Sequence, residues 1–297
     1  MTSRQQAADR TQIGGQFWLG CAVWAYKDWV GRFYPPGSRA KDFLQRYGER
    51  LTAVEGNTTF YHVPTPATVA RWAQETPQSF RFCPKLPRSI THTGAVAPQL
   101  SAARTFDHLM QGLGPRLGPI FAQLPPSYGP AQWPDLTEFL QGWSAATPLA
   151  VEVRHADWFQ APNATRLNAL LRQHRAGRVL LDSRPVYDWQ QAADDPQRQS
   201  QRRKPQVPLQ PAITAPFTLV RYIGHPELMR NHRYLTGWVD RVNRALSQGA
   251  QVYFFVHCPQ EAESPAIAGY FQQLLEQAGV AVPPLPSPPS PEQLALF

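Results

Sequence analysis

Residues 149–183 read LAVEVRHADWFQAPNATRLNALLRQHRAGRVLLDS, and this stretch decides the fold. It opens and closes with short apolar runs, at 148–154 and 178–183, which have the length and composition of buried strands. Between them, the apolar residues of segment 164–174 fall three and four positions apart, as in an amphipathic helix. A strand, a helix and a second strand in this order predict a parallel sheet.

The same alternation extends over most of the chain. Further apolar runs lie at 17–24, 51–57, 80–86, 118–124, 217–224 and 252–257, which brings the expected strands to eight. Helical spacing recurs at 40–51, 66–76, 101–113, 135–143, 235–249 and 264–279. Eight strands within about 240 residues match a closed barrel better than an open sheet. We therefore predict a (β/α)8 TIM-type barrel of parallel strands.

Two segments depart from this pattern. Residues 184–215 are polar and interrupted by prolines, so we expect an irregular segment that replaces or extends the sixth helix. After residue 279 the chain becomes a proline-rich spacer that ends in QLALF, and such a composition favours an extended tail. The expected organisation is a flexible segment at 1–16, a barrel at 17–279 and a tail at 280–297.

Composition limits the class of protein. Hydrophobic residues make up 42% of the chain, enough for a sizeable core. The formal net charge of +8 predicts attraction to anionic partners such as nucleic acid or phosphorylated molecules. Cys21, Cys83 and Cys258 lack the short spacings of a zinc or redox motif. With no apolar leader and no apolar stretch of about 18 residues, we expect a cytoplasmic protein without a membrane segment.

Polar residues gather where the predicted strands end. In a TIM barrel these carboxyl ends form the catalytic face. The period-2 geometry of a strand places Glu55 with Asn57, and Glu152 with Arg154, on one face each. The candidate site residues are, as acid–base groups, Glu55, Glu152 and Asp182, and, as substrate-binding groups, Tyr26, Asn57, Tyr61, Lys85, Gln123, Arg154, His155, Trp158, Arg221 and His257.

Three readings of this cluster remain open. The first is a structural layer of ion pairs, because three acids and three bases balance in number. The second is a site in which Lys85, Arg154 and Arg221 bind phosphate while a carboxylate transfers protons, as in a hydrolase or lyase. The third is a divalent metal held by Glu55, Glu152, Asp182 and His257, although no local ligand motif supports it.

Several strings at these strand ends resemble the YecE-like family, known as domain of unknown function 72. They are WAYKDWVGRFYPPG, VEGNTTFYHVP, FRFCPKLPRSITH, GPIFAQLPPSY, VEVRHADWF, and LLDS followed by FTLVRYIG, and the similarity runs in order from about residue 19 to residue 279. The resemblance implies a TIM-type barrel with shared polar residues at one end, and it implies no settled activity. The matching positions are Tyr26, Glu55, Asn57, Tyr61, Lys85, Gln123, Glu152, Arg154, His155, Asp182 and Arg221.

The last five residues resemble the pentapeptide that binds the bacterial sliding clamp. Gln293, Leu294, Leu296 and Phe297 match its polar and apolar anchors. A few apolar anchors on a flexible tether can bind a preformed groove, and the alternative is a terminus that packs back on the barrel. Three functions follow: an enzyme recruited to DNA, a non-catalytic module that binds nucleic acid or the clamp, and a metabolic enzyme for a phosphorylated small molecule.

Overall fold

The computed structural model describes residues 15–143, 147–187 and 205–287, and it has the predicted barrel architecture. Each strand is short, buried and rich in branched or aromatic residues, and neighbouring strands pair in parallel. The strands are β1 (Phe17–Cys21), β2 (Ala53–Gly56), β3 (Arg81–Pro84), β4 (Ile120–Gln123), β5 (Leu149–Glu152), β6 (Gly177–Asp182), β7 (Phe217–Ile223) and β8 (Gln251–His257).

The sheet closes on itself almost completely. Its order is β3-β2-β1-β8-β7-β6-β5-β4, so the first and last strands of the chain are neighbours. The two ends of this order are joined by isolated parallel bridges, which pair Phe82 with Leu117 and Lys85 with Phe121. The amide of Leu86 also donates to the carbonyl of Phe121 at 3.0 Å. Backbone bonds therefore connect β3 to β4, as closure of a barrel requires.

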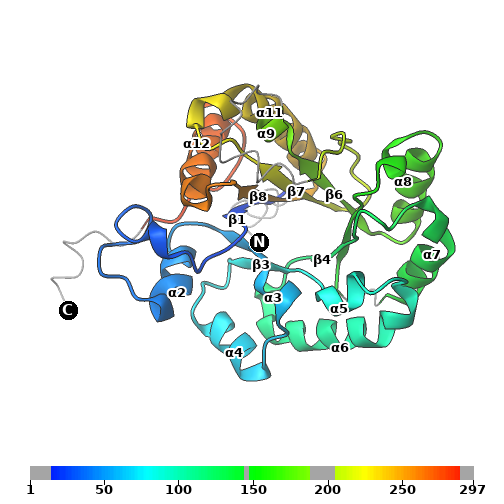
Figure 1. Cartoon of the computed structure of the whole chain (residues 1–297). Helices are drawn as coiled ribbons and strands as arrows, with labels where there is room; N and C mark the ends of the chain where they lie inside the picture. Colours follow the sequence, from blue (N-terminus) through cyan, green and yellow to red (C-terminus); the bar gives the residue numbers. More distant parts are fainter. Residues whose placement is uncertain (1–14, 144–146, 188–204, 288–297) are drawn as a thin grey trace, which may run out of the picture.

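Helices surround the strands on the outside (Figure 1). In α8, the buried residues Leu167, Leu170 and Leu171 follow the predicted spacing and pack against the sheet. None of the helices in the described ranges is long and apolar enough to cross a membrane. The α-helices are α2 (Phe43–Gly48), α3 (Thr58–Tyr61), α4 (Pro66–Gln74), α5 (Arg88–Thr91), α6 (Leu100–Met110), α7 (Trp133–Gly142), α8 (Asn163–Gln173), α9 (Arg184–Tyr187), α11 (His232–Ser247) and α12 (Ser264–Gln277).

The connection between β6 and β7 differs from the others. Its described parts are the four-residue α9 and residues 205–216, which form neither helix nor strand. The Thr214 hydroxyl donates to the carbonyl of Ala176 at 2.7 Å, and the Gln210 amide donates to that of Phe159 at 2.7 Å. Residues 205–216 therefore form an irregular segment that is bonded to the neighbouring β/α units. This agrees with the sequence pattern, which lacked a regular sixth helix. The predicted N-terminal segment up to residue 14 and the end of the tail lie outside the described residues.

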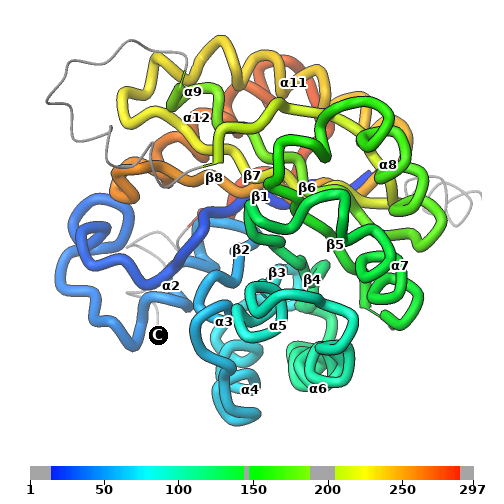
Figure 2. Tube along the Cα trace, turned by 45° about the vertical axis from the view of Figure 1, so that its right-hand side comes forward, coloured from blue at the N-terminus to red at the C-terminus, as the bar shows by residue number. Residues whose placement is uncertain are grey.

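Two apolar layers fill the molecule, one inside the barrel and one between strands and helices. The ring formed by β1 to β8 lies within the ring of helices, with β1 next to β8 (Figure 2). Large side chains close the inside at the amino ends of the strands, where Trp18 stacks on Tyr253 with ring centroids 4.7 Å apart. Phe121 and Phe255 continue this inner layer towards the carboxyl ends. The barrel is thus a packed core, and the residues that follow at the carboxyl ends rest on it.

Candidate functional site

The inward-facing positions change from apolar to charged at the carboxyl ends of the strands. On β7, Leu219 belongs to the inner apolar layer and Arg221, two residues later, faces the same way. The same step of two leads on other strands from an inner apolar residue to a polar one. The residues reached in this way are Glu55, Lys85, Gln123, Glu152, Arg221 and His257, and all six are buried.

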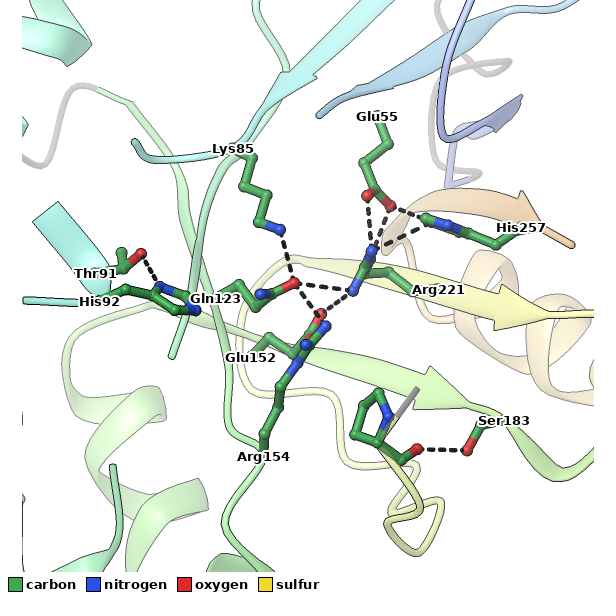
Figure 3. A network of polar contacts seen from close by, with 11 residues as sticks. Glu55, Lys85, Thr91, His92, Gln123, Glu152, Arg154, Ser183, Arg221 and His257 are labelled. Atoms are coloured by element: carbon green, nitrogen blue, oxygen red, sulfur yellow. Dashed lines mark hydrogen bonds and ion pairs between the residues drawn. The ribbon is translucent and has the colours of Figure 1, made fainter. Parts of the chain in front are cut away.

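Arg221 is the centre of this network (Figure 3). Its Nε and Nη2 atoms donate to the two carboxylate oxygens of Glu55 at 2.8 and 2.9 Å. Its Nη1 atom donates to Oε2 of Glu152 at 2.6 Å. His257 Nε2 lies 2.7 Å from Oε2 of Glu55. One guanidinium thus holds two carboxylates from opposite halves of the chain, in the fork geometry that suits arginine.

The amide oxygen of Gln123 forms the second centre. It accepts from Lys85 Nζ at 2.8 Å and from Arg154 Nη2 at 2.6 Å. Arg154 also donates through Nε to Oε1 of Glu152 at 2.5 Å. Glu152 therefore lies between two guanidinium groups, one from Arg154 and one from Arg221. The two centres share these side chains and make one continuous network across β2, β3, β4, β5, β7 and β8.

The two carboxylates are held ionised. Burial raises the pKa of Glu55, but the charges of Arg221 and His257 outweigh it, and the pKa is well below its ordinary value. Burial likewise raises the pKa of Glu152, while Arg154 and Arg221 together lower it to about 2. Both groups are fully paired with cations, so they carry negative charge at neutral pH and orient the arginines.

Lys85 is in the opposite situation. Burial and then repulsion from Arg221 lower the pKa of its amine from 10.5 to about 7, in spite of attraction to Glu152 and Glu55. The ammonium group lies 3.7 Å from the centroid of the Phe60 ring, which stabilises the charged form only in part. Attraction to the two carboxylates therefore does not offset the cost of burying the charge of Lys85.

A cavity of about 490 Å³ opens over this network at the carboxyl end of the barrel. Its lining includes the cations of the network, whereas Glu55 and Glu152 lie beneath the surface. Glu261 of η8 (Glu261–Glu263) also lines the cavity and adds a third carboxylate at the mouth. The polar residues of the lining are Asn57, Tyr61, Lys85, Gln123, Arg154, Arg221, His257 and Glu261.

One predicted acid–base residue is not part of the network. Asp182 is fully buried, but it lies on the outward face of β6, one position after Leu181, which lines the cavity. Its carboxylate accepts from the indole of Trp238 at 2.8 Å and from both arms of the Arg184 guanidinium at 2.8 Å. The expectation that Asp182 joins the others at the mouth was wrong, because the alternation of the strand turns it towards α11.

Trp158 also differs from the prediction of a substrate-binding ring. It is fully buried, its indole donates to the carbonyl of Tyr128 at 2.8 Å, and it packs on Trp133. The ring is therefore a core residue. Of the other predicted binding residues, Tyr26 packs against Trp29 and His155 accepts from the amide of Asp157 at 3.2 Å, and neither is in the cavity lining.

Two residues near the network were not found from the sequence. Phe60 of α3 packs beneath the Lys85 amine, and His92, directly after α5, lies beside Gln123 (Figure 3). Burial and the nearby Lys85 and Arg154 charges lower the pKa of His92 to about 4, so this ring is neutral at pH 7. Both stand in the strings that suggested the family, but only their packing on each other, at 5.0 Å between ring centroids, singles them out.

The arrangement has no ready metal centre within the described part of the chain. No group of three or more histidine, cysteine or acidic residues there is placed to hold a metal ion. The proposed ligand set is divided, because Asp182 faces away from Glu55, Glu152 and His257.

Comparison with known proteins places the chain among uncharacterised relatives. Residues 18–293 match the family described as "Protein of unknown function DUF72". The chain is 32% identical to the UPF0759 protein YecE of Escherichia coli strain K12 over 282 residues, covering 94% of this chain and 99% of that protein. It is 26% identical to the UPF0759 protein YunF of Bacillus subtilis over 158 residues, covering 49% and 53% of the two chains.

Solved structures show the same fold. A DUF72 family protein from Enterococcus faecalis superposes with a TM-score of 0.68 at 17% identity, covering 93% of this chain and 99% of that one. A DUF72 family protein from Thermotoga maritima gives a TM-score of 0.66 at 21% identity, covering 88% and 99%. The likeness in fold extends over nearly the full length of these proteins.

Proposed function

The chain belongs to the DUF72 family of proteins of unknown function, and from the chemistry of the barrel mouth we propose that it binds the phosphate group of an anionic ligand. The observation that carries this proposal is the placement of the charged groups: Lys85, Arg154 and Arg221 line the cavity, while the two carboxylates that pair with the arginines lie beneath it. An anion in the cavity would accept hydrogen bonds from the cationic groups that line it.

The donors of Lys85 and Arg154 are only partly used. Among the described residues the Lys85 ammonium makes one hydrogen bond, to Gln123, and it has three donors. Arg154 uses Nε and Nη2, and its side chain is 16% exposed. The remaining donors can bind phosphate oxygens without breaking the existing network. Phosphate is also the anion that TIM barrels frequently bind at this end of the strands.

The two glutamates serve this site as positioning residues. Each is fully engaged with guanidinium groups and has a strongly lowered pKa, which makes it a poor proton donor or acceptor near neutrality. Lys85, with a pKa of about 7, is better matched to proton transfer at physiological pH. For a hydrolase or lyase-type reaction at the mouth we therefore assign proton transfer to Lys85.

The ligand class follows from size and charge. A cavity of about 490 Å³ is within the range of small-molecule sites and accommodates a sugar phosphate or a nucleotide. The net charge of +8 favours the approach of such anions, including the ends of nucleic acids. We propose a phosphorylated small molecule or a terminal nucleotide as the occupant.

Calorimetric titration of the purified protein with inorganic phosphate and with ribose 5-phosphate tests this proposal. Substituting Arg154→Met removes a charged hydrogen-bond donor and should weaken binding about tenfold or more, since such bonds contribute about 1.5–3 kcal/mol. The matched control is Arg71→Met, which removes an exposed arginine on α4 and should leave binding unchanged. Absence of binding by both compounds at millimolar concentration, or equal binding by Arg154→Met, contradicts the proposal.

A protein partner is proposed from the sequence alone. The terminal residues Gln293, Leu294, Leu296 and Phe297 lie outside the described residues. Their likeness to the clamp-binding pentapeptide, at the end of a proline-rich spacer, supports recruitment of the barrel to the bacterial sliding clamp. A tether of this kind raises the local concentration of the barrel near DNA.

A further inference from the structure

A second hollow adjoins the phosphate cavity and has a different character. It has a volume of about 440 Å³, and its walls are mostly apolar. It is lined by Thr58, Tyr61, His62, Pro64, Thr68 and Trp72. Tyr61 is in the lining of both spaces, so the two hollows meet at its ring.

Tyr61 is the side chain that makes this boundary unusual. It is 70% exposed, which is the largest value among the exposed large hydrophobic side chains of the described residues. A bare aromatic ring at the rim of a cavity is costly in water and offers a flat surface to a planar ligand group. It stands on α3, the short helix that directly follows β2.

The same helix connects Tyr61 to the charged network. Phe60 packs edge-on against the Tyr61 ring at 5.1 Å and lies under the Lys85 ammonium at 3.7 Å. The Thr59 hydroxyl donates to the carbonyl of Lys85 at 2.6 Å, which fixes α3 against the end of β3. The aromatic rim and the cationic floor are therefore held at a fixed separation by consecutive residues of one element.

We propose that the ligand of the mouth is a nucleoside monophosphate, or a phosphate monoester with a similar planar group. Its phosphate lies on Lys85 and Arg154, and its base stacks on Tyr61 over the apolar hollow. The assignment of the base rests on the proposed phosphate site. Two observations favour this assignment. One hollow has a polar lining and the other an apolar lining, and the exposed Tyr61 is part of both.

Comparison of two probes separates the phosphate site from the stacking site. Ribose 5-phosphate carries the sugar and phosphate only, and adenosine 5′-monophosphate adds the base. Stacking of a base on an aromatic side chain should make the nucleotide bind about tenfold more tightly. Tyr61→Ala should remove that advantage and change ribose 5-phosphate binding less than twofold, whereas Tyr61→Phe should preserve it.

The control is Met229→Ala, which removes another exposed apolar side chain (63% exposed) that lines neither hollow. It should bind both probes as the unmodified protein does. Equal affinity for the two probes, or an equal loss of both on Tyr61→Ala, overturns the stacking assignment while leaving the phosphate site. Failure of ribose 5-phosphate to bind at all overturns the proposed function itself.

Discussion

Replacing Lys85 with methionine should make the protein more stable and at the same time weaken its binding of phosphate. Methionine has a similar length and no charge, so it fills the place of the lysine stem against Phe60. Lys85 is 5% exposed, and the attraction of its amine to Glu152 and Glu55 offsets its burial and the repulsion from Arg221 and Arg154 only in part. The protein therefore carries an unfavourable charge in its ligand-free state.

The magnitude follows from the pKa of that amine. In the unfolded chain it titrates near 10.5, and in the folded protein near 7. This gap of about 3.5 corresponds to about 5 kcal/mol of destabilisation when the amine is charged in both states, and to about 4 kcal/mol at pH 7. Loss of the hydrogen bond to Gln123 and of the contact with Phe60 offsets about 1–2 kcal/mol. The expected net gain at pH 7 is about 2–3 kcal/mol.

The same difference between the unfolded and folded pKa of Lys85 determines the sign of the pH dependence. Between pH 7 and 10.5 the unfolded chain binds more protons at Lys85 than the folded protein does, so the stability of the wild type rises with pH. From pH 7 to 8.5 the wild type should gain about 1–2 kcal/mol relative to Lys85→Met. Glu152 and His92, with pKa values of about 2 and 4, keep their charge states over this range.

Equilibrium urea unfolding at pH 7.0, 7.75 and 8.5 measures both effects. Lys41→Met, at an exposed lysine of η2 (Ala40–Asp42), is the control and should follow the wild type at every pH. In calorimetry with ribose 5-phosphate, Lys85→Met should bind more weakly than the wild type, and Lys41→Met should bind as the wild type does. The reasoning is refuted if Lys85→Met is less stable than the wild type at pH 7 and the difference between them does not change with pH.

Two further predictions concern residues outside the cavity. Asp182→Asn should destabilise the protein by about 2–4 kcal/mol in urea unfolding, because it weakens buried bonds to Trp238 and Arg184, yet it should leave ribose 5-phosphate affinity unchanged; a selective loss of binding would return Asp182 to the site. A peptide covering residues 287–297 should bind purified bacterial sliding clamp in a fluorescence polarisation assay, and the double substitution Leu296→Ala, Phe297→Ala should abolish this. No binding at high micromolar peptide would exclude recruitment through the tail.

Most of the barrel was predictable because local patterns decide it. The apolar run at 217–224 corresponds to β7 at Phe217–Ile223, and the helical spacing at 101–113 to α6 at Leu100–Met110. The polar, proline-punctuated stretch after residue 183 indicated an irregular sixth connection for the same local reason. The contact between β3 and β4 that closes the barrel follows from eight strands joined by right-handed crossovers. The alternation of strands and helices in the sequence indicates both.

The site was predictable only as far as the period of two could be applied. Glu152 and Arg154 are two residues apart and both belong to the network, as the strand period indicates. Asp182 was misplaced because strand-end position was used without parity: Val179 and Leu181 face inward, so the next residue must face the helices. Trp158 was misplaced because its partners, Tyr128 and Trp133, come from another part of the chain and leave no local signal.

The position of Asp182 also bears on the choice between the proposed binding site and a structural layer of ion pairs. With Asp182 at the mouth, three acids would balance three bases and the layer would need no ligand. In the structure, Asp182 is paired with Arg184 behind the sheet, Glu55 and Glu152 pair with the two arginines beneath the cavity, and Glu261 lies in the cavity lining. A layer selected for stability alone gains nothing from a lysine whose pKa falls to about 7. We propose that an anion bound in the cavity accounts for this lysine and for the position of Arg154 and Arg221 on the cavity surface.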